Sequence, residues 1–419
     1  MVSRRLFLQS CAAAAVAAAS PVRNAWAANA PGVTDTEIKI GQTFPYSGPA
    51  SGYVAIARAE AAYFKMINEK GGVNGRKLNL ISLDDGYSPA KTVEQTRRLI
   101  EQEGVAFTFQ SFGGFTNLAV RTYLNANKAP QLFVSAGADQ IDDPDHFPWT
   151  IGFNPATSTE GRIYTKHILA TKADAKIGVL YQNDQLGKTF LAGVRDALGD
   201  QHAGMLVKEV SYEVAEPTVD SQVVTLQGAG VDALIIAATS KAAAQAIRKV
   251  YDIGWTPDRY LFFGAASIAG TLKPAGLEKS KGLITAGYLK DPTVPIWQDD
   301  PGFKEWAAFA TKYMSPADVR EGFAVYGFTA AANDGSRSRA MRRRPVAREH
   351  SAPGARDQGP RAADAVAGDQ DQHFARQLFL DPANAARPVQ RRNVGAVWRV
   401  GQRLSGLALG LVQPSGRII

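Results

Sequence analysis

Cysteine is almost absent from this chain, because Cys11 is the only one among 419 residues. It falls in an N-terminal segment that we expect to be removed, so the mature chain has none. Disulfide bonds, thiolate catalysis and cysteine metal sites are therefore excluded together. Histidine is also scarce: His146, His167 and His202 are the only ones between residues 28 and 332, and none has a second ligand at metal-site spacing.

The motifs that usually carry enzyme chemistry are missing as well. The chain has no Gly-x-Ser-x-Gly elbow, no phosphate-binding loop of the Gly-Lys-Thr kind and no Gly-x-Gly-x-x-Gly. The Gly228-Ala229-Gly230 triplet lies between an expected helix and an expected strand, where turn glycines are common. We therefore expect no catalytic residues, no metal and no cofactor, although a small-molecule enzyme remains an alternative.

The first 27 residues have the pattern of an export signal. Arg4 and Arg5 form a charged start, an apolar stretch follows, and Ala25-Trp26-Ala27 supplies a small-x-small cleavage site. The apolar run of residues 11–19 is too short for a membrane span. The two arginines also fit the twin-arginine pattern, so both the general secretory and the twin-arginine route stay open. We expect a periplasmic protein that does not itself span the membrane.

The positive net charge of +8 is unevenly distributed along the chain. Residues 333–419 contain 15 Arg, no Lys and 7 acidic residues, whereas residues 28–332 contain 29 basic and 32 acidic residues. The body is therefore mildly acidic, and its lysines disappear abruptly near residue 332. Either residues 333–419 are a basic tail that could bind nucleic acid or anionic lipid, or two reading frames have been joined there.

Strand-like and helix-like segments alternate through residues 32–332, and this order predicts parallel sheets with crossover helices. The length favours two domains. One expected helix covers residues 53–70 and ends at Gly71-Gly72, as a helix C-terminus should. The expected strands are Glu37–Thr43, Lys77–Leu83, Val105–Phe109, Gln131–Ser135, Lys176–Tyr181, Leu206–Tyr212, Asp232–Ala237, Tyr260–Gly264 and Leu283–Tyr288.

The first of these strands leads directly into a small polar turn. Pro45 stops the strand, and Ser47 with Gly48 then leaves a hydroxyl group and an accessible backbone N–H at its carboxyl end. In open α/β sheets, ligands bind at this end of the strands. Together with the export signal, this placement favours a receptor for a small ligand over an enzyme.

Seven segments follow one another in the sequence: Gly41–Pro49, Gly71–Arg76, Leu83–Tyr87, Tyr181–Asp184, Asp220–Gln222, Ala246–Lys249 and Tyr326–Phe328. In this order they resemble the branched-chain amino acid type of ABC-transporter substrate-binding proteins. The resemblance covers residues 32–332 and implies a type I periplasmic-binding fold: two doubly wound α/β lobes of parallel sheet, three crossovers and a ligand cleft between the lobes.

The resemblance also implies where the first lobe contacts a ligand. Three loops follow successive strands, and their glycines let backbone N–H groups approach an anion. We expect Thr116 to begin a helix whose N-terminus favours a carboxylate, although a plain N-cap is the alternative role. The implied ligand residues are Tyr46, Ser47, Gly48, Phe112, Gly113, Gly114, Phe115, Thr116, Gly137, Ala138 and Asp139.

The second lobe is expected to cover the ligand with Gln182, Asn183, Thr239 and Ser267. It departs from amino acid binders in two places. Leu186 stands where relatives often have an aromatic residue, and residues 264–267 lack the acid that usually holds an α-ammonium group. We therefore expect a less cationic carboxylate or an amide, because a buried ammonium without a counter-charge is costly. Asp139 and Asp184 are possible substitutes, and Asp184 could equally be a helix N-cap.

The family resemblance favours a frameshift at the second boundary. Relatives typically continue with Ala-Ala-Gln-Thr-Met-Val and later Gln-Cys-Gly-Asp-Asp-Leu-Ser-Arg-Glu. GC-rich codons for these stretches, displaced by one base, encode residues 331–335 and 340–349 of this chain. The arginine cluster at residues 342–344 is then an accident of codons, and we expect a poorly stable product. DNA sequence around codon 332 tests this interpretation.

The predicted organisation is a signal peptide at 1–27, a first lobe at 28–152, a second lobe at 153–282, a return to the first lobe at 283–332 and an aberrant tail at 333–419. The expected function is capture of a small carboxylate or amino-acid-like ligand by hinge closure, followed by delivery to an ABC permease in the inner membrane. The expected partners are this ligand and the permease, without nucleic acid. A sensing domain of the same fold is the alternative.

Overall fold

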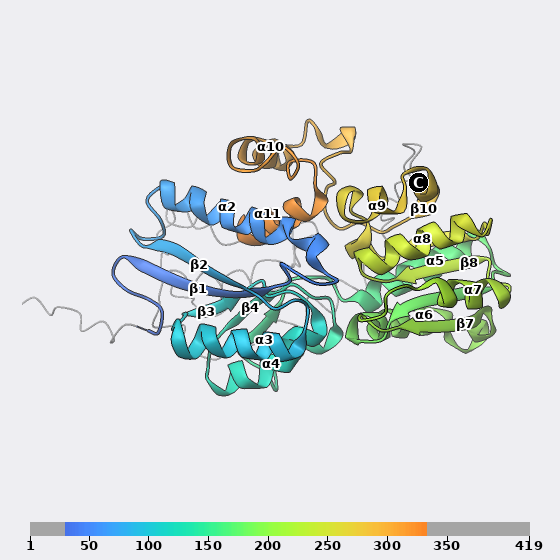
Figure 1. Cartoon of the computed structure of the whole chain (residues 1–419), viewed down its shortest axis with the longest axis horizontal. Helices are drawn as coiled ribbons and strands as arrows, with labels where there is room; N and C mark the ends of the chain where they lie inside the picture. The colour runs from blue at the N-terminus through green and yellow to red at the C-terminus, as the bar shows by residue number, and fades with distance from the viewer. Residues whose placement is uncertain (1–29, 333–419) are drawn as a thin grey trace, which may run out of the picture.

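The computed structural model describes residues 30–332, so the predicted signal peptide and the predicted aberrant tail lie outside the described residues. Two α/β lobes lie side by side (Figure 1), and each is built on a sheet of five parallel strands. This arrangement confirms the predicted fold class. The first sheet has the strand order β2-β1-β3-β4-β5 and the second β10-β9-β8-β6-β7.

The strands lie close to their predicted positions. Two differ: β5 is a three-residue strand that the sequence pattern did not reveal, and β10 is much shorter than the expected strand at residues 283–288. The strands are β1 (Glu37–Phe44), β2 (Lys77–Asp84), β3 (Phe107–Phe109), β4 (Gln131–Val134), β5 (Thr150–Gly152), β6 (Ile177–Gln182), β7 (Leu206–Tyr212), β8 (Ala233–Ala237), β9 (Asp258–Leu261) and β10 (Leu283–Ile284).

Helices cover both faces of each sheet, as crossover connections require. In the first lobe, α2 and α11 lie on one face while α3 and α4 lie on the other (Figure 1). The helices are α2 (Ala55–Glu69), α3 (Pro89–Arg97), α4 (Gly114–Ala126), α5 (Thr157–Thr171), α6 (Gln185–His202), α7 (Asp220–Gly228), α8 (Ser240–Asp252), α9 (Lys273–Ala275), α10 (Pro301–Tyr313) and α11 (Gly322–Ala332).

Helix α2 shows how the sequence fixes an element. Its apolar face packs Tyr63 and Phe64 into the core of the first lobe, which also takes in α10 and α11. The helix ends where Gly71 and Gly72 adopt φ values of 97° and 71°, a conformation that glycine adopts without strain. The Gly72 N–H donates to the Ile67 carbonyl at 2.9 Å, which satisfies one of the last carbonyl groups.

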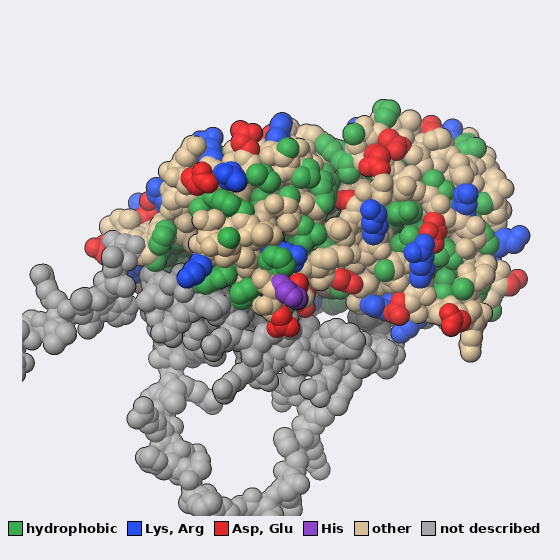
Figure 2. All heavy atoms as spheres, turned by 90° about the horizontal axis from the view of Figure 1, so that it is seen from below, with side chains coloured by type: hydrophobic (Ala, Val, Ile, Leu, Met, Phe, Trp, Pro, Cys, Tyr) green, Lys and Arg blue, Asp and Glu red, His purple; other side chains and the backbone are tan. Residues whose placement is uncertain are grey.

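The chain crosses between the lobes twice within the described residues. It leaves the first sheet after β5 and enters α5 of the second lobe, and after β10 it returns to α10 and α11, which pack on the first lobe. The face of Figure 2 shows Lys and Arg interspersed with Asp and Glu over both lobes, and hydrophobic side chains where the lobes meet.

Candidate functional site between the two lobes

A cavity of about 450 Å³ lies at the junction of the lobes. Its walls come from loops at the carboxyl ends of strands in both sheets and from the connection between α10 and α11. A parallel sheet brings these ends to one edge, which explains why distant segments meet here. The first lobe and α11 contribute Tyr53, Ile56, Tyr87, Phe112, Gly113, Gly114, Ser135, Ala136, Gly137, Ala138, Asn154, Arg320, Gly322, Phe323 and Tyr326.

The second lobe and the segment after β10 supply the opposite wall of the cavity. Most of these residues are apolar, and the polar ones are chiefly hydroxyl-bearing. Lys290 also lines it and pairs with Asp300 at 2.6 Å. The wall consists of Thr157, Leu186, Thr239, Phe262, Phe263, Gly264, Ala266, Ser267, Ile268, Leu272, Leu283, Thr285, Gly287, Tyr288, Leu289, Lys290, Asp291, Val294 and Trp297.

The loop after β3 places the start of α4 at the cavity. Gly113 has φ 99° and is the residue before the helix, so α4 begins at Gly114 and not at Thr116. The Thr116 hydroxyl lies inside the first turn and donates to the Phe112 carbonyl at 2.6 Å, so Thr116 is not the N-cap. The first N–H groups of a helix have no partner within it, and they favour an anion.

Aromatic rings form the first-lobe wall. The Tyr53 ring lies between Phe112 and Phe323, with centroids 4.6 Å and 4.8 Å away. Tyr87 meets Phe112 at 5.8 Å and meets Phe115 edge-on at 4.7 Å. Desolvation raises the pKa of the Tyr53 phenol to about 12 and raises the pKa of Tyr87 well above its ordinary value, so both stay neutral hydrogen-bonding groups at physiological pH.

The second-lobe wall rests on a saturated polar network centred on Gln182. Its Oε1 atom accepts hydrogen bonds from the Tyr212 hydroxyl at 2.8 Å and the Thr239 hydroxyl at 3.0 Å. Its Nε2 atom donates to Asp184 and, at 3.5 Å, to the Tyr87 hydroxyl. All four hydrogen-bonding positions of the Gln182 amide are thus occupied by protein groups. The side chain is therefore held in one orientation behind the cavity wall.

Asp184 is the N-cap of α6. Its Oδ1 atom accepts from the N–H groups of Leu186 at 2.9 Å and Gly187 at 3.3 Å. Desolvation raises the pKa of this carboxyl group, while its hydrogen bonds act in the opposite direction. Of the two roles that the sequence left open, the structure shows the capping one.

Direct hydrogen bonds join the two lobes around the cavity. The Ser240 N–H at the start of α8 donates to the Tyr53 hydroxyl at 3.3 Å. On the first-lobe side, the Tyr326 hydroxyl of α11 pairs with Ser135 at 3.0 Å and donates to Asn154. The Ser240–Tyr53 bond and the Gln182–Tyr87 bond each join a residue of one lobe to a residue of the other, so the two lobes are in direct contact at the cavity.

The predicted site residues fall into two groups. Eight line the cavity: Phe112, Gly113, Gly114, Gly137, Ala138, Leu186, Thr239 and Ser267. The other nine do not line it: Tyr46, Ser47, Gly48, Phe115, Thr116, Asp139, Gln182, Asn183 and Asp184.

Several residues of the second group have partners elsewhere. The Tyr46 hydroxyl donates to Ser82 at 2.7 Å, and the Ser47 hydroxyl donates to Asp84 at 2.6 Å. Asp139 accepts from the Ser158 hydroxyl at 3.1 Å, and the Asn183 amide donates to Glu213.

Other cavity residues were not anticipated from the sequence. Tyr53, Tyr87 and Phe323 form much of the aromatic wall, and Asn154 with Tyr326 adds polar groups. Two of them, Tyr87 and Tyr326, lie in segments that carry the family resemblance, and this was a signal that could have pointed to the site.

The comparisons with known proteins agree with this geometry. Residues 37–332 match the family model described as "Periplasmic binding protein", and the chain belongs to this family. It is 25% identical over 308 residues to Leu/Ile/Val-binding protein homolog 7 of Brucella abortus, with 70% of this chain and 75% of that protein covered. The match confirms the predicted family and a binding-protein role.

Solved structures show the same fold. A fatty acid ABC transporter substrate-binding protein from Thermomonospora curvata is 24% identical, with a TM-score of 0.63 and coverage of 73% of this chain and 77% of that one. A branched-chain amino acid ABC transporter protein from Thermus thermophilus with bound valine is 17% identical, with a TM-score of 0.64 and coverage of 74% and 79%.

Two further observations concern residues 30–332 only. The helices there are all too short or too polar to cross a membrane. His, Cys, Asp and Glu side chains form no group of three that could hold a metal ion in that range. The matched family is one of binding proteins and not one of enzymes.

Proposed function

We propose that this protein is the exported, periplasmic substrate-binding component of an ABC importer. It captures a small carboxylate or amino-acid-like ligand between its lobes and delivers it to a membrane permease. The observation that carries this proposal is the cavity of about 450 Å³, which both lobes and the α10–α11 connection enclose. A cavity of this size lies in the range of small-molecule sites.

Different groups in the cavity walls suit different parts of such a ligand. The aromatic rings of Tyr53, Phe112 and Phe323 suit its apolar part, and the N-terminus of α4 at Gly114 suits its carboxylate. Hinge closure brings Thr239 of the second lobe over the ligand. A ligand that contacts both walls stabilises the closed form, because it gains contacts there that the open form lacks.

The ligands of two structural relatives support this range of ligands. The Thermus thermophilus structure contains valine, and the Thermomonospora curvata protein is named for fatty acids. One is a zwitterion and the other a simple carboxylic acid, so the carboxylate is the group that they share.

Calorimetric titration of the full chain with a panel of amino acids, aliphatic acids and aromatic acids tests the proposal. We expect saturable one-to-one binding of at least one compound in the micromolar range, about −8 kcal/mol. Small-angle scattering should show a smaller radius of gyration when that compound is bound. Turnover of a compound, or no binding across the panel, would contradict the proposal.

A further inference from the structure

Of the charged side chains at the cavity, that of Arg320 has no polar partner in the described part of the chain. Within residues 30–332, the charged residues that line the cavity are Lys290, Asp291 and Arg320. Lys290 pairs with Asp300 at 2.6 Å, and the Asp291 carboxylate accepts from the N–H and the hydroxyl of Thr293 at 2.7 Å and 2.6 Å. The Arg320 guanidinium forms no ion pair with an acid of that range.

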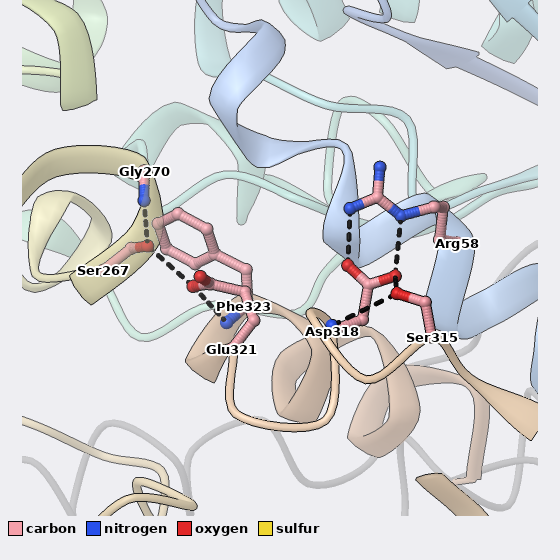
Figure 3. A network of polar contacts seen from close by, with 7 residues as sticks. All are labelled: Arg58, Ser267, Gly270, Ser315, Asp318, Glu321 and Phe323. Carbon is pink, nitrogen blue, oxygen red and sulfur yellow. Dashed lines mark hydrogen bonds and ion pairs between the residues drawn. The ribbon is translucent and has the colours of Figure 1, made fainter. Parts of the chain in front are cut away.

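Arg320 belongs to the α10–α11 connection, which is anchored to both lobes (Figure 3). Two residues before Arg320, Asp318 accepts from the Arg58 Nε atom of α2 at 3.0 Å. One residue after it, the Glu321 Oε1 atom accepts from the Ser267 hydroxyl of the second lobe at 2.6 Å. The nearest acids in the sequence are thus engaged by other groups, and the Arg320 backbone is fixed between them. The Arg320 side chain is exposed and also lines the cavity, so it lies at the cavity mouth.

A row of aromatic rings connects this mouth to the N-terminus of α4. The rings of Phe112, Tyr53 and Phe323 follow one another, with centroids 4.6 Å and 4.8 Å apart, and all three line the cavity. At one end of the row, Phe112 precedes Gly113, the residue before α4. At the other end, Phe323 follows Arg320 by three residues. The row is therefore an apolar strip whose ends lie near two groups that attract anions.

Both of these groups suit a carboxylate. The guanidinium group of Arg320 presents a planar fork of N–H donors that matches the two oxygens of a carboxylate. The first N–H groups of α4 have no partner within the helix and favour an anion. A ligand with a single carboxylate engages only one of the two. A ligand with a carboxylate at each end and an apolar middle engages both and covers the rings between them.

We propose that Arg320 binds a second carboxylate of the ligand, at the opposite end of the ring row from α4. This inference rests on the proposed function and narrows its ligand to a dicarboxylate whose middle is an apolar chain or ring. Arg320 is then the residue that distinguishes a dicarboxylate from a monocarboxylate of the same length. The sequence pattern did not indicate this role, because Arg320 lies between two helices and not in a loop after a strand.

Calorimetric titration of the full chain with matched compounds tests this proposal. One series is octanedioate, its monomethyl ester and octanoate, and the other is 3-(4-carboxyphenyl)propanoate, its aryl monomethyl ester and 3-phenylpropanoate. Each ester keeps the length of the diacid and removes one charge. We expect the diacid of at least one series to bind about 10-fold more tightly than its ester, as for a charge pair at a partly open mouth. Because salt screens such a pair, this difference should shrink at high ionic strength.

The variant Arg320→Gln removes the charge and keeps a polar side chain. We expect it to reduce the preference for the diacid over its ester to less than about 2-fold, while affinity for the ester persists. Arg320→Lys should retain part of the preference, since it keeps the charge but loses the fork of donors, and a loss of folding could not give that result. Arg97→Gln on α3 is the matched control: it removes another exposed arginine, one that does not line the cavity, and should behave as the unmodified chain.

Three results would overturn the inference without touching the proposed function: each ester binds as tightly as its diacid, Arg320→Gln keeps the full preference, or neither diacid binds although a monocarboxylate or an amino acid does. Absence of binding by every compound of both series and of the wider panel would instead contradict the proposed function, and the inference with it.

Discussion

The two lobes share an architecture but present different walls to the cavity. The first lobe presents packed rings, those of Tyr53 and Phe112, with Phe323 from α11. The second lobe and the segment after β10 present a mostly apolar wall, whose polar members are chiefly hydroxyl-bearing and include Thr239 of the network around Gln182. Both walls supply apolar contact area, and they differ in how it is organised: stacked rings form the first wall, whereas the second also holds the Thr239 hydroxyl in place through Gln182.

Each lobe also holds one glutamate whose carboxyl group is strongly desolvated. In the first lobe, Glu60 accepts from the Gln42 amide at 2.6 Å, and its Oε1 atom has no partner. In the second, Glu160 accepts from the Phe263 N–H and contacts the Tyr164 hydroxyl, both at 2.6 Å. Glu160 thus ties a cavity-lining loop to α5, whereas Glu60 ties no cavity residue through these hydrogen bonds.

Close helix packing in both lobes gives the largest expected effect. A Cβ atom on Gly193 of α6 would lie 2.0 Å from the Ser158 carbonyl oxygen of α5, and one on Gly327 of α11 would lie 2.3 Å from that of Ile56 in α2. We expect Gly193→Val and Gly327→Val each to lower the free energy of unfolding by about 3 kcal/mol or more, measured by urea denaturation. If either variant were as stable as the unmodified chain, the two helices that it affects could move apart without a cost in stability.

Gly204→Ala is the matched control for these two variants. No atom lies within 4 Å of a Cβ atom placed there, so stability should change by less than about 0.5 kcal/mol.

The contrast between the walls gives an intermediate effect. Phe112→Leu keeps an apolar side chain but removes the ring contacts with Tyr53 and Phe44, so ligand affinity should fall about 10-fold. Thr239→Val removes the hydroxyl that donates to Gln182, so unfolding free energy should fall by about 1 kcal/mol with a smaller change in affinity. Titration calorimetry measures the affinity of each variant, and thermal melting measures its stability. If Phe112→Leu changed mainly stability and Thr239→Val changed mainly affinity, this difference between the two walls would be refuted.

The smallest expected effect comes from Glu60 and Glu160, whose ionisation makes the stability of the fold depend on pH. Desolvation raises the pKa of Glu160 from its ordinary value of 4.5 to about 8, and raises that of Glu60 well above 4.5. Between pH 4.5 and about 8, Glu160 in the folded state keeps a proton that it has already lost in the unfolded state. Stability should therefore fall as pH rises from about 4.5 to 8.

Glu160→Gln mimics the protonated carboxyl group and should flatten this pH dependence. At pH 8 the variant should be more stable than the unmodified chain, by about 1 kcal/mol in unfolding free energy, because it has no carboxyl group to ionise. Glu60→Gln should act in the same direction. Melting temperatures measured from pH 4.5 to 9 check this, and an unchanged slope in both variants would show that neither carboxyl group stays protonated in the folded protein.

Local patterns in the sequence determined the elements. Alternation of strand and helix segments located nine of the strands, glycine signals ended α2 at the observed place, and Asp184 before α6 had the chemistry of an N-cap. These features depend on residues within a few positions of each other, so the sequence contains all the information that they need. The three-residue β5 has too few residues for any periodicity to appear.

Tertiary structure decided which side chains meet in the cavity. Ser267 and Glu321 are 54 residues apart, and Ser135 and Tyr326 are 191 apart, yet both pairs form hydrogen bonds. Tyr46 and Ser47 follow a strand as a ligand loop should, but their hydroxyl groups bond to Ser82 and Asp84. The physical reason is that a strand end only places a residue at the edge of a sheet. The packing of two lobes and a returning segment then determines whether its side chain faces the cavity or another part of the protein.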